Sequence, residues 1–413
     1  DLLHRELRFE RRGGGLPLSS ADSYEIDGWL DLTCLRDLAG RLPPADNFPP
    51  FVAKNPFAEV GSVFSLIDGG DQLVHHPAED FVATVGRFFA EAAADPDVVA
   101  IKTTLYRVGE RSPVVDALVD AARAGKEVAA FVELKARFDE THNVQWVKRL
   151  EDAGAHVVYG IVGIKTHAKV ALVVRQTSEG VRRYAHIATG NYNAATARFY
   201  TDLGLFTADP EITADLVDLF NQLTGSTAAP TGETRKLLVS PVGTLPGLLA
   251  RIEREVSHVA AGRGGLIRIQ LNGLEDPEVI TALYRAAAAG VVVQLIVRGL
   301  CSLRPGVPGL SDRIRVRSVL GRFLEHQRIF HFGNGGADDY LIGSADLRPR
   351  NLRRRVEVLV PVSRRDLKAR LASLLDQLWD EPAGWELQPD GRYVRPTPVP
   401  QGTHLHDRLV SGP

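Results

Sequence analysis

Two histidines in this chain are each followed, two residues later, by a cation. His167 precedes Lys169 in the run GIKTHAK, and His326 precedes Arg328 in the run FLEHQRIF. Imidazole has a reference pKa of about 6.5, so it is mostly neutral at pH 7 and can attack phosphorus without first losing a proton. Side chains two residues apart point the same way along a strand, which would let each cation neutralise developing oxygen charge. The pattern favours phosphoryl or phosphodiester transfer.

A single histidine at a strand end is more often structural than catalytic, so position has to decide between these interpretations. Both histidines end an apolar run, and both occupy corresponding places in an internal repeat. We therefore interpret His167 as a nucleophile and His326 as a general acid or base that faces it from a matching domain. Lys169 and Arg328 are the cations that we expect to assist them.

The repeat consists of a strand, a helix and a second strand. Each helix begins with a capping residue followed by proline and ends before a glycine, which are typical boundary signals. Such a unit predicts parallel strand pairing, with ligands beyond the carboxyl ends of the strands. The features lie at 98–101, Ser112-Pro113, Gly125 and 128–134 in the first copy, and at 266–271, Asp276-Pro277, Gly290 and 291–297 in the second.

We predict an α/β protein with two similar domains in tandem. The first spans 54–228 and the second 229–413, with a linker of small residues and proline at 226–232. Residues 1–53 lack pattern and are expected to be the remnant of an upstream domain. An amphipathic helix late in the second domain is indicated by Leu367, Leu371, Leu374, Leu375 and Leu378. His404 and His406 follow a proline-rich stretch, so we expect a solvated tail there.

Composition excludes several classes of protein. Hydrophobic residues make up 44% of the chain and charged residues 24%, which argues against disorder, and no apolar run is long enough to span a membrane. A net charge of −2 argues against general nucleic-acid binding, and codon bias is the simplest explanation for the many arginines. Two distant cysteines and no secretory signal indicate a cytoplasmic protein. Because Met is absent and Asp1 comes first, we expect a fragment or a processed chain.

The duplicated His-x-Lys/Arg pattern resembles the phospholipase D superfamily. The usual motif of that superfamily has an aspartate five residues after the lysine, where this chain has Val174 and Gly333. The phosphodiesterase form of the motif is therefore broken in both halves, which makes a phospholipase or nuclease the less favoured interpretation.

A longer set of motifs resembles the polyphosphate kinase family of the phosphohistidine type, nearly continuously from about residue 50 to 393. The motifs are IKTTLYR, VELKARFDE, GIKTHAK, TGNYN, TARFYTDLGLFT, IVRGLCSLRPGVPGLS, GRFLEHQRIFHF, IGSADLRPRN and RRVEVLVPV. The resemblance implies two phospholipase D-like domains. It also implies reversible transfer of the terminal phosphate of ATP to inorganic polyphosphate, with Mg²⁺ as cofactor. It further implies a homo-oligomer, a dimer or a tetramer, with possible peripheral membrane association.

The same resemblance implies roles for particular residues. His167 would be phosphorylated, and His186 of the run YAHIATGNYN would be a further site histidine. Metal and phosphate would be bound by Arg107 and Arg137, and the nucleotide by Tyr200, Arg298 and His326. From the residues alone, Tyr200 would more often belong to the core than bind a ligand, and Arg298 could equally be a surface residue.

A catalytically impaired module that binds polyphosphate or another anion is the alternative function. The family usually has a lysine where this chain has Gln270, and it has Trp-Met where Leu347 and Arg348 stand. The loss of a cation at Gln270 would weaken phosphate binding, whereas His167, Lys169 and His326 are intact and favour the enzyme.

Overall fold

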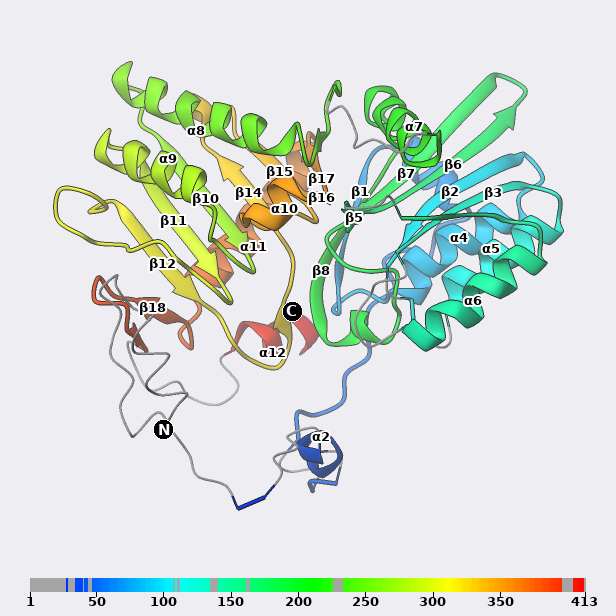
Figure 1. The fold of residues 1–413 in the computed structure, drawn as a ribbon, viewed down its shortest axis with the longest axis horizontal. Helices are drawn as coiled ribbons and strands as arrows, with labels where there is room; N and C mark the ends of the chain where they lie inside the picture. Colours follow the sequence, from blue (N-terminus) through cyan, green and yellow to red (C-terminus); the bar gives the residue numbers. More distant parts are fainter. Residues whose placement is uncertain are drawn as a thin grey trace. The chain divides into compact units, whose positions relative to one another are not determined.

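The computed structural model describes residues 27–28, 34–39, 41–43, 47–106, 108–109, 112–133, 140–160, 164–225, 233–395 and 404–411. The chain divides into two units, Asp1–Pro50 and Phe51–Pro413. Helix α2 (Cys34–Ala39) belongs to the first unit. The other described helices and strands belong to the second unit, which is built from two α/β halves (Figure 1). None of the described helices is long and apolar enough to cross a membrane.

The first half is a mixed sheet with helices α4, α5 and α6 packed on one face (Figure 1). Its strand order is β1-β8-β7-β6-β2-β3-β4, in which β2, β3 and β4 are parallel and the other pairs are antiparallel. The strands are β1 (Gln72–His76), β2 (Val98–Leu105), β3 (Glu127–Val132), β4 (His156–Tyr159), β6 (Lys169–Thr177), β7 (Gly180–Ala188) and β8 (Tyr200–Thr207). The helices are α3 (Val63–Asp68), α4 (Arg87–Ala94), α5 (Pro113–Arg123), α6 (Glu140–Asp152) and α7 (Pro210–Gly225).

The second half repeats this plan, with α8 and α9 on one face of its sheet (Figure 1). The strand order is β19-β18-β12-β11-β10-β14-β15-β17-β9. The strands are β9 (Leu238–Val239), β10 (Leu266–Leu271), β11 (Val292–Val297), β12 (Ile314–Ser318), β14 (Ile329–Phe332), β15 (Asp339–Gly343), β17 (Val358–Val362), β18 (Trp385–Leu387) and β19 (Tyr393–Val394). The helices are α8 (Thr244–Ala260), α9 (Pro277–Ala288), α10 (Pro349–Arg353), α11 (Arg365–Trp379) and α12 (Leu405–Ser411).

The predicted strand–helix–strand units are present in both halves. Ser112 caps α5 by accepting a hydrogen bond from the N–H of Val115, and Asp276 caps α9 in the same way with two N–H groups. The strands that flank each helix pair in parallel, β2 with β3 and β10 with β11. The sheets are mixed, however, because hairpins such as β6–β7 and β14–β15 extend each parallel core with antiparallel strands. The linker predicted at 226–232 lies outside the described residues.

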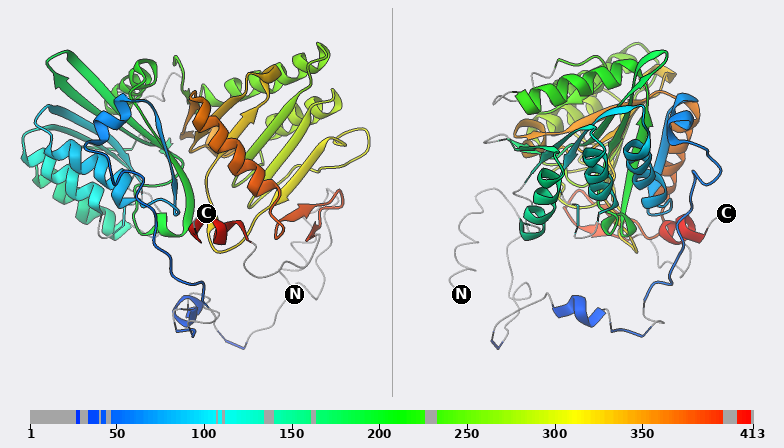
Figure 2. Two further views of the ribbon diagram at one scale, coloured as in Figure 1. Left: turned by 180° about the vertical axis from the view of Figure 1, so that it is seen from behind. Right: turned by 90° about the vertical axis from the view of Figure 1, so that its right-hand side faces the viewer.

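A shared hydrophobic core joins the two halves. It combines residues such as Val170 and Leu205 of the first sheet with Ile329 and Val358 of the second. The amphipathic helix predicted from the leucine spacing is α11, whose five leucines are all buried in this core. Figure 2 (left) shows α11 crossing the face of the second sheet that is at the back in Figure 1. The leucines of the helix pack in the shared core on this face.

Two short strands link the halves through their backbones. Strand β5 (Lys165–Thr166) of the first half pairs in parallel with β16 (Arg355–Val356) of the second. Strand β13 (Leu324–Glu325) of the second half pairs in parallel with β8 of the first. Each half thus contributes a two-residue strand that pairs with a strand of the other half. These two strands directly precede His167 and His326.

Candidate active site

His167 and His326 each directly follow one of the paired two-residue strands. His167 comes after β5, and its backbone N–H donates to the carbonyl of Val356 at 2.9 Å. His326 comes after β13, and its backbone N–H donates to Oγ1 of Thr201 at 3.2 Å. Both histidines are therefore positioned by the half of the molecule to which they do not belong.

A carboxylate from the second half orients the imidazole of His167. Nδ1 of His167 lies 2.9 Å from Oε2 of Glu357, a residue whose side chain is fully buried. Nδ2 of Asn351 donates to the other oxygen of Glu357 at 2.6 Å. An ionised carboxylate only accepts hydrogen bonds, so Nδ1 carries the proton and Nε2 keeps its lone pair. Nε2 is the atom that this arrangement leaves available for attack.

The surroundings of His167 favour the neutral imidazole. Burial lowers the pKa of His167 well below its usual value, and the charges of Lys169, Arg355, Arg328 and His326 lower it further. The ring of Tyr106 packs edge-on against the imidazole, with ring centres 5.2 Å apart. A neutral imidazole is the nucleophilic form, so burial and the nearby cations both favour attack on phosphorus.

Lys169 and Glu357 form a buried pair of titratable groups beside His167. Burial lowers the pKa of Lys169 to about 7, although the Glu357 carboxylate opposes the shift. Burial raises the pKa of Glu357 to about 7, although the charge of Lys169 opposes that shift. The ammonium of Lys169 donates to the carbonyl of His167 and lies over the ring of Tyr106, 5.1 Å from its centre. Both groups therefore change charge close to neutral pH.

These two pKa shifts predict a bell-shaped pH dependence of kcat/KM with its maximum near pH 7. Below about pH 7 Glu357 gains a proton and no longer holds Nδ1–H of His167, and above about pH 7 Lys169 loses its charge. The acid limb should disappear in Glu357→Gln. Oδ1 of Asn351 has no hydrogen-bond partner among the described residues, so a rotated Asn351 can accept from the new amide while the amide oxygen still faces His167.

Glu357→Gln should lower kcat/KM about 10- to 100-fold, by analogy with the loss of a group that orients a metal-bound histidine. Glu253→Gln on α8 is a matched control, because it makes the same change at an exposed position. An acid limb that Glu357→Gln retains unchanged would assign that limb to another group.

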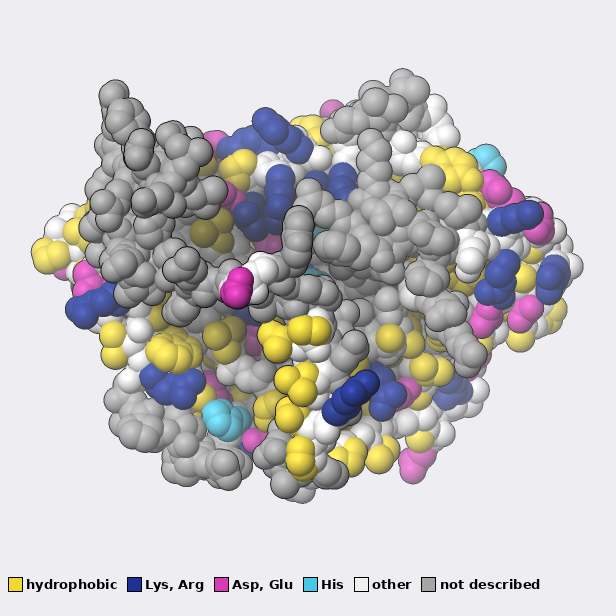
Figure 3. All heavy atoms as spheres, turned by 60° about the horizontal axis from the view of Figure 1, so that its bottom comes forward, with side chains coloured by type: hydrophobic (Ala, Val, Ile, Leu, Met, Phe, Trp, Pro, Cys, Tyr) yellow, Lys and Arg dark blue, Asp and Glu magenta, His cyan; other side chains and the backbone are white. Residues whose placement is uncertain are grey.

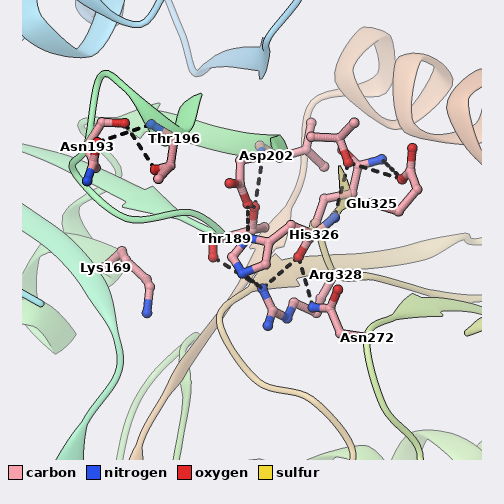
Figure 4. Close-up of polar contacts among 12 residues, drawn as sticks. Lys169, Thr189, Asn193, Thr196, Asp202, Asn272, Glu325, His326 and Arg328 are labelled. Atoms are coloured by element: carbon pink, nitrogen blue, oxygen red, sulfur yellow. Dashed lines mark hydrogen bonds and ion pairs between the residues drawn. The ribbon is translucent and has the colours of Figure 1, made fainter. Parts of the chain in front are cut away.

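His326 is held by a carboxylate from the first half. Nδ1 of His326 lies 2.8 Å from Oδ1 of Asp202, which also accepts from the hydroxyl of Thr189 at 2.6 Å (Figure 4). Burial raises the pKa of Asp202, but the charge of His326 and its hydrogen bond outweigh this and keep the pKa below its usual value. Burial also lowers the pKa of His326, against the charge of Asp202. His326 is thus a neutral imidazole, and its Nε2 faces Nη1 of Arg328 at 3.4 Å.

The two histidines therefore have reciprocal partners. Glu357 of the second half orients His167 of the first, and Asp202 of the first half orients His326 of the second. Lys169 pairs with Ala188 of β7, and the carbonyl of the next residue, Thr189, accepts from Arg328 at 3.4 Å, so the segments that carry the two histidines lie close together. The sequence reasoning did not identify either carboxylate. The available signal was a single acid inside a largely apolar run of sequence, in RRVEVLVPV and in YTDLGLF.

Arg328 differs from its counterpart Lys169. Its guanidinium donates to both oxygens of Asp346, at 3.0 and 3.3 Å. It also donates to the carbonyl of His326 at 2.6 Å (Figure 4). Burial raises the pKa of Asp346, but the charge of Arg328 outweighs this and lowers the pKa to about 2. Arg328 is 3% exposed. These bonds make it an anchor for the His326 loop as well as a source of positive charge at the site.

The predicted nucleotide-binding residues lie around His326. The ring of Tyr200 is tilted against the imidazole of His326, with ring centres 5.1 Å apart. Arg298 follows β11 and donates to Oδ1 of Asn272 and to the carbonyl of Glu325, the latter at 2.6 Å. The structure thus brings Tyr200, Arg298 and His326 together at one end of the second sheet. Their role in nucleotide binding stays a prediction.

His186 lies in a different environment from the other predicted site residues. It is 1% exposed and packs against Phe206, with ring centres 4.4 Å apart, and its Nδ1 bonds to the hydroxyl of Tyr192 at 3.1 Å. Burial lowers the pKa of His186 to about 3. Among the described residues its partners belong to the core of the first half, so direct contact with a phosphoryl group has no support from this geometry.

The predicted metal site cannot be located in the described part of the chain. Arg107 and Arg137 lie outside the described residues, and a guanidinium is a cation with no lone pair to offer a metal. No group of three or more His, Cys, Asp or Glu side chains among the described residues could hold an ion. The carboxylates at the site, Asp202, Asp346 and Glu357, are instead bonded to His326, Arg328 and His167. Mg²⁺ thus stays a prediction, and it fits best as an ion bound by the substrate phosphates.

Comparison with known proteins first defines the class. The fold is a tandem pair of α/β halves, as the sequence predicted. It matches the crystal structure of a phosphatidylserine synthase from Haemophilus influenzae with a TM-score of 0.52, at 12% identity over 75% of this chain and 86% of that one. It matches the crystal structure of polyphosphate kinase from Porphyromonas gingivalis with a TM-score of 0.80, at 36% identity over 87% of this chain and 56% of that one.

The family follows from the sequence comparisons. Residues 62–229 match the model of polyphosphate kinase C-terminal domain 1, and residues 237–404 match that of C-terminal domain 2. The polyphosphate kinase of Streptomyces coelicolor is 50% identical over 96% of this chain and 52% of its own length. That of Synechocystis is 50% identical over 93% of this chain and 55% of its own length. The chain belongs to the polyphosphate kinase family, and it spans about half the length of these relatives.

Proposed function

We propose that the chain transfers the terminal phosphate of ATP reversibly to inorganic polyphosphate, through a phosphohistidine on His167. The observation that carries the proposal is the buried His167–Glu357 pair, which leaves Nε2 with its lone pair and without a proton. The relatives that this chain resembles are named polyphosphate kinases, and the proposed reaction is a polyphosphate kinase reaction. A module that only binds an anion would have no use for an oriented, neutral imidazole.

In the first step, Nε2 of His167 attacks the γ-phosphorus of ATP. An N–P bond forms, the bond from phosphorus to the β-γ bridging oxygen breaks, and ADP leaves with the electron pair. Nδ1 keeps its proton throughout, and the negative charge of Glu357 stabilises the positive charge that develops on the ring. Lys169, when protonated, neutralises charge on the transferring group.

In the second step, a terminal oxygen of polyphosphate attacks the same phosphorus and the N–P bond breaks. The ring of His167 returns to its neutral form. A terminal phosphate that arrives with a proton can pass it to Nε2 of His326, which is neutral and held by Asp202. Polyphosphate is a flexible polyanion, and its attraction to this chain must be local because the net charge is only −2. Figure 3 likewise shows Lys and Arg interspersed with Asp and Glu over the face that it presents.

Incubation of the full chain with ATP labelled in the γ-phosphate tests the proposal. A phosphohistidine should give label on the protein that is labile in acid and stable in base, and that moves to polymer when polyphosphate is added. Label that resists acid, or polymer that forms without labelled protein, would contradict the mechanism. A cytoplasmic location, an oligomeric assembly and Mg²⁺ dependence remain further parts of the proposal.

Arg298→Ala should raise the KM for ATP more than it weakens polymer binding. Its guanidinium sits beside Tyr200 and His326, so a phosphate or sugar oxygen of the nucleotide can replace Asn272 as its partner. A lost hydrogen bond to a charged group costs about 1.5–3 kcal/mol, equivalent to roughly 10- to 100-fold in KM. ATP kinetics and polymer binding would be measured on the same preparations, with Arg285→Ala on α9 as the control. An equal loss in both parameters would remove Arg298 from a nucleotide-specific role.

A further inference from the structure

Helix α12 places a buried histidine beside the strand that carries His326. The helix begins at Leu405, one residue beyond the region that matches the second family model. His406 is 3% exposed, which corrects the prediction of a solvated tail. Its Nε2 lies 2.7 Å from Oε1 of Glu325, and its Nδ1 accepts from the N–H of Phe323 at 3.1 Å.

These two hydrogen bonds fix the protonation of His406. A backbone N–H can only donate, so Nδ1 of His406 must carry a lone pair. An ionised carboxylate can only accept, so Nε2 of His406 must carry the proton that it donates to Glu325. His406 is therefore a neutral donor with a single allowed tautomer at this position.

Glu325 is the centre of a buried polar network that spans both halves. Its Oε2 accepts from Gln270 at 2.6 Å, from the hydroxyl of Thr201 at 3.1 Å and from Gln327 at 3.4 Å. Glu325 itself is 3% exposed. A buried carboxylate is tolerated only when its oxygens have hydrogen-bond donors. The donor for Oε1 is His406, so α12 completes the set.

The network leads directly to the candidate active site. Thr201 donates its hydroxyl to Glu325 and accepts the backbone N–H of His326 with the same oxygen. The carbonyl of Glu325 accepts from Nε of Arg298 at 2.6 Å. Figure 4 shows Glu325 and His326 leading from this network to Asp202 and Arg328. A change in the position of Glu325 would therefore move both His326 and Arg298.

The docking of α12 depends on specific contacts. Leu405 is 1% exposed within the core shared by the halves, and its N–H donates to the buried carboxylate of Glu381 at 2.7 Å. A Cβ at Gly321 would lie 2.7 Å from Nδ1 of His406, so glycine permits the close approach of the imidazole. A helix as short as α12 is not stable in isolation, so these contacts hold it in place.

We propose that α12 is a positioning element of the active site, and that His406 acts through Glu325 to hold His326 and Arg298 in place. This role rests on the proposed phosphotransfer function. Without His406, Oε1 of Glu325 would lack its donor, and the carboxylate would turn or take up water. The strand that carries His326 would then lose its fixed position. Misplacement of a reacting group by about 1 Å can cost about 100-fold in rate.

Three substitutions in the full chain separate the two bonds of His406. His406→Gln can keep a donor to Glu325, His406→Asn can keep only an acceptor for the N–H of Phe323, and His406→Ala keeps neither. We expect kcat to fall about 10- to 100-fold in the Ala and Asn variants and to recover in the Gln variant. His404→Ala is the matched control from the same segment, because His404 is partly exposed and faces Glu381 rather than Glu325.

A readout that needs no catalysis distinguishes this proposal from the proposed function. The titration of the His326 imidazole, followed by NMR on the histidine-labelled chain, should shift in His406→Ala and His406→Asn but not in His404→Ala. If the parent forms no polymer, the proposed function fails, and this titration alone decides the role of His406. An unchanged titration in those two variants, or a Gln variant as impaired as the Ala variant, overturns the proposal. Should His406→Ala not fold, the Gln and Asn variants decide, since both fill the space.

Discussion

Replacing His167 with alanine is expected to abolish both the protein-bound phosphate and the formation of polymer. Under the proposed mechanism, the imidazole supplies the atom that forms the N–P bond, and alanine has no such atom. The side chain is 13% exposed and its partner Glu357 is fully buried, so His167→Ala removes the donor of Oε2 and leaves Asn351 bonded to Oε1. Some loss of thermal stability is therefore expected alongside the loss of activity.

The measurement is acid-labile label per protein chain, together with polymer formed from ATP. His156→Ala is the matched control, because His156 is an exposed histidine on β4 of the same sheet. A second variant, His167→Gln, keeps a donor near Glu357 and so separates chemistry from stability. Label that persists at the parental level in either His167 variant would assign the nucleophile to another residue.

Replacing His326 with alanine should lower kcat about 10²- to 10⁴-fold, the range usual for the loss of general acid–base assistance. The variant also removes the tilted contact with Tyr200 and leaves Asp202 with Thr189 as its remaining hydrogen-bond donor. Because His167 is intact, label from ATP should still accumulate on the protein, but more slowly. This difference separates a residue that assists from one that is attacked.

Single-turnover labelling and steady-state polymer formation measure the two effects in the same variant. Asp202→Asn is the companion variant, since it keeps the shape of the carboxylate but not its charge, and it should give a smaller loss. Parental kcat in His326→Ala would remove His326 from the reaction. Complete loss of label in that variant would give it a more direct part in the first step than we propose.

The sequence allowed the fold and the pair of histidines to be predicted because the signals are local. Ser112 with Pro113 and Asp276 with Pro277 start helices through contacts within a few residues, and the repeat made His167 and His326 recognisable as equivalents. The parallel core was likewise predicted correctly. The antiparallel strands that extend it were missed, since the inference was drawn only from the strand–helix–strand units.

The partners of the histidines could not be predicted, because each comes from a distant part of the chain. Glu357 is 190 residues from His167, and Asp202 is 124 residues from His326. A single acid in an apolar run of sequence has many possible partners until the halves are packed together. His406 was missed for a related reason: a seven-residue helix after a proline-rich stretch has no periodicity of its own, and tertiary contacts create it.

The paired strands at β5–β16 and β13–β8 also bear on how substrates can come and go. Backbone ladders and a common apolar core cross from one half to the other at the two histidines. A hinge motion that separated the two halves would have to break these strand pairs and expose the shared core in every turnover. Under the proposed function, the substrates would therefore reach the two histidines without a separation of the two halves.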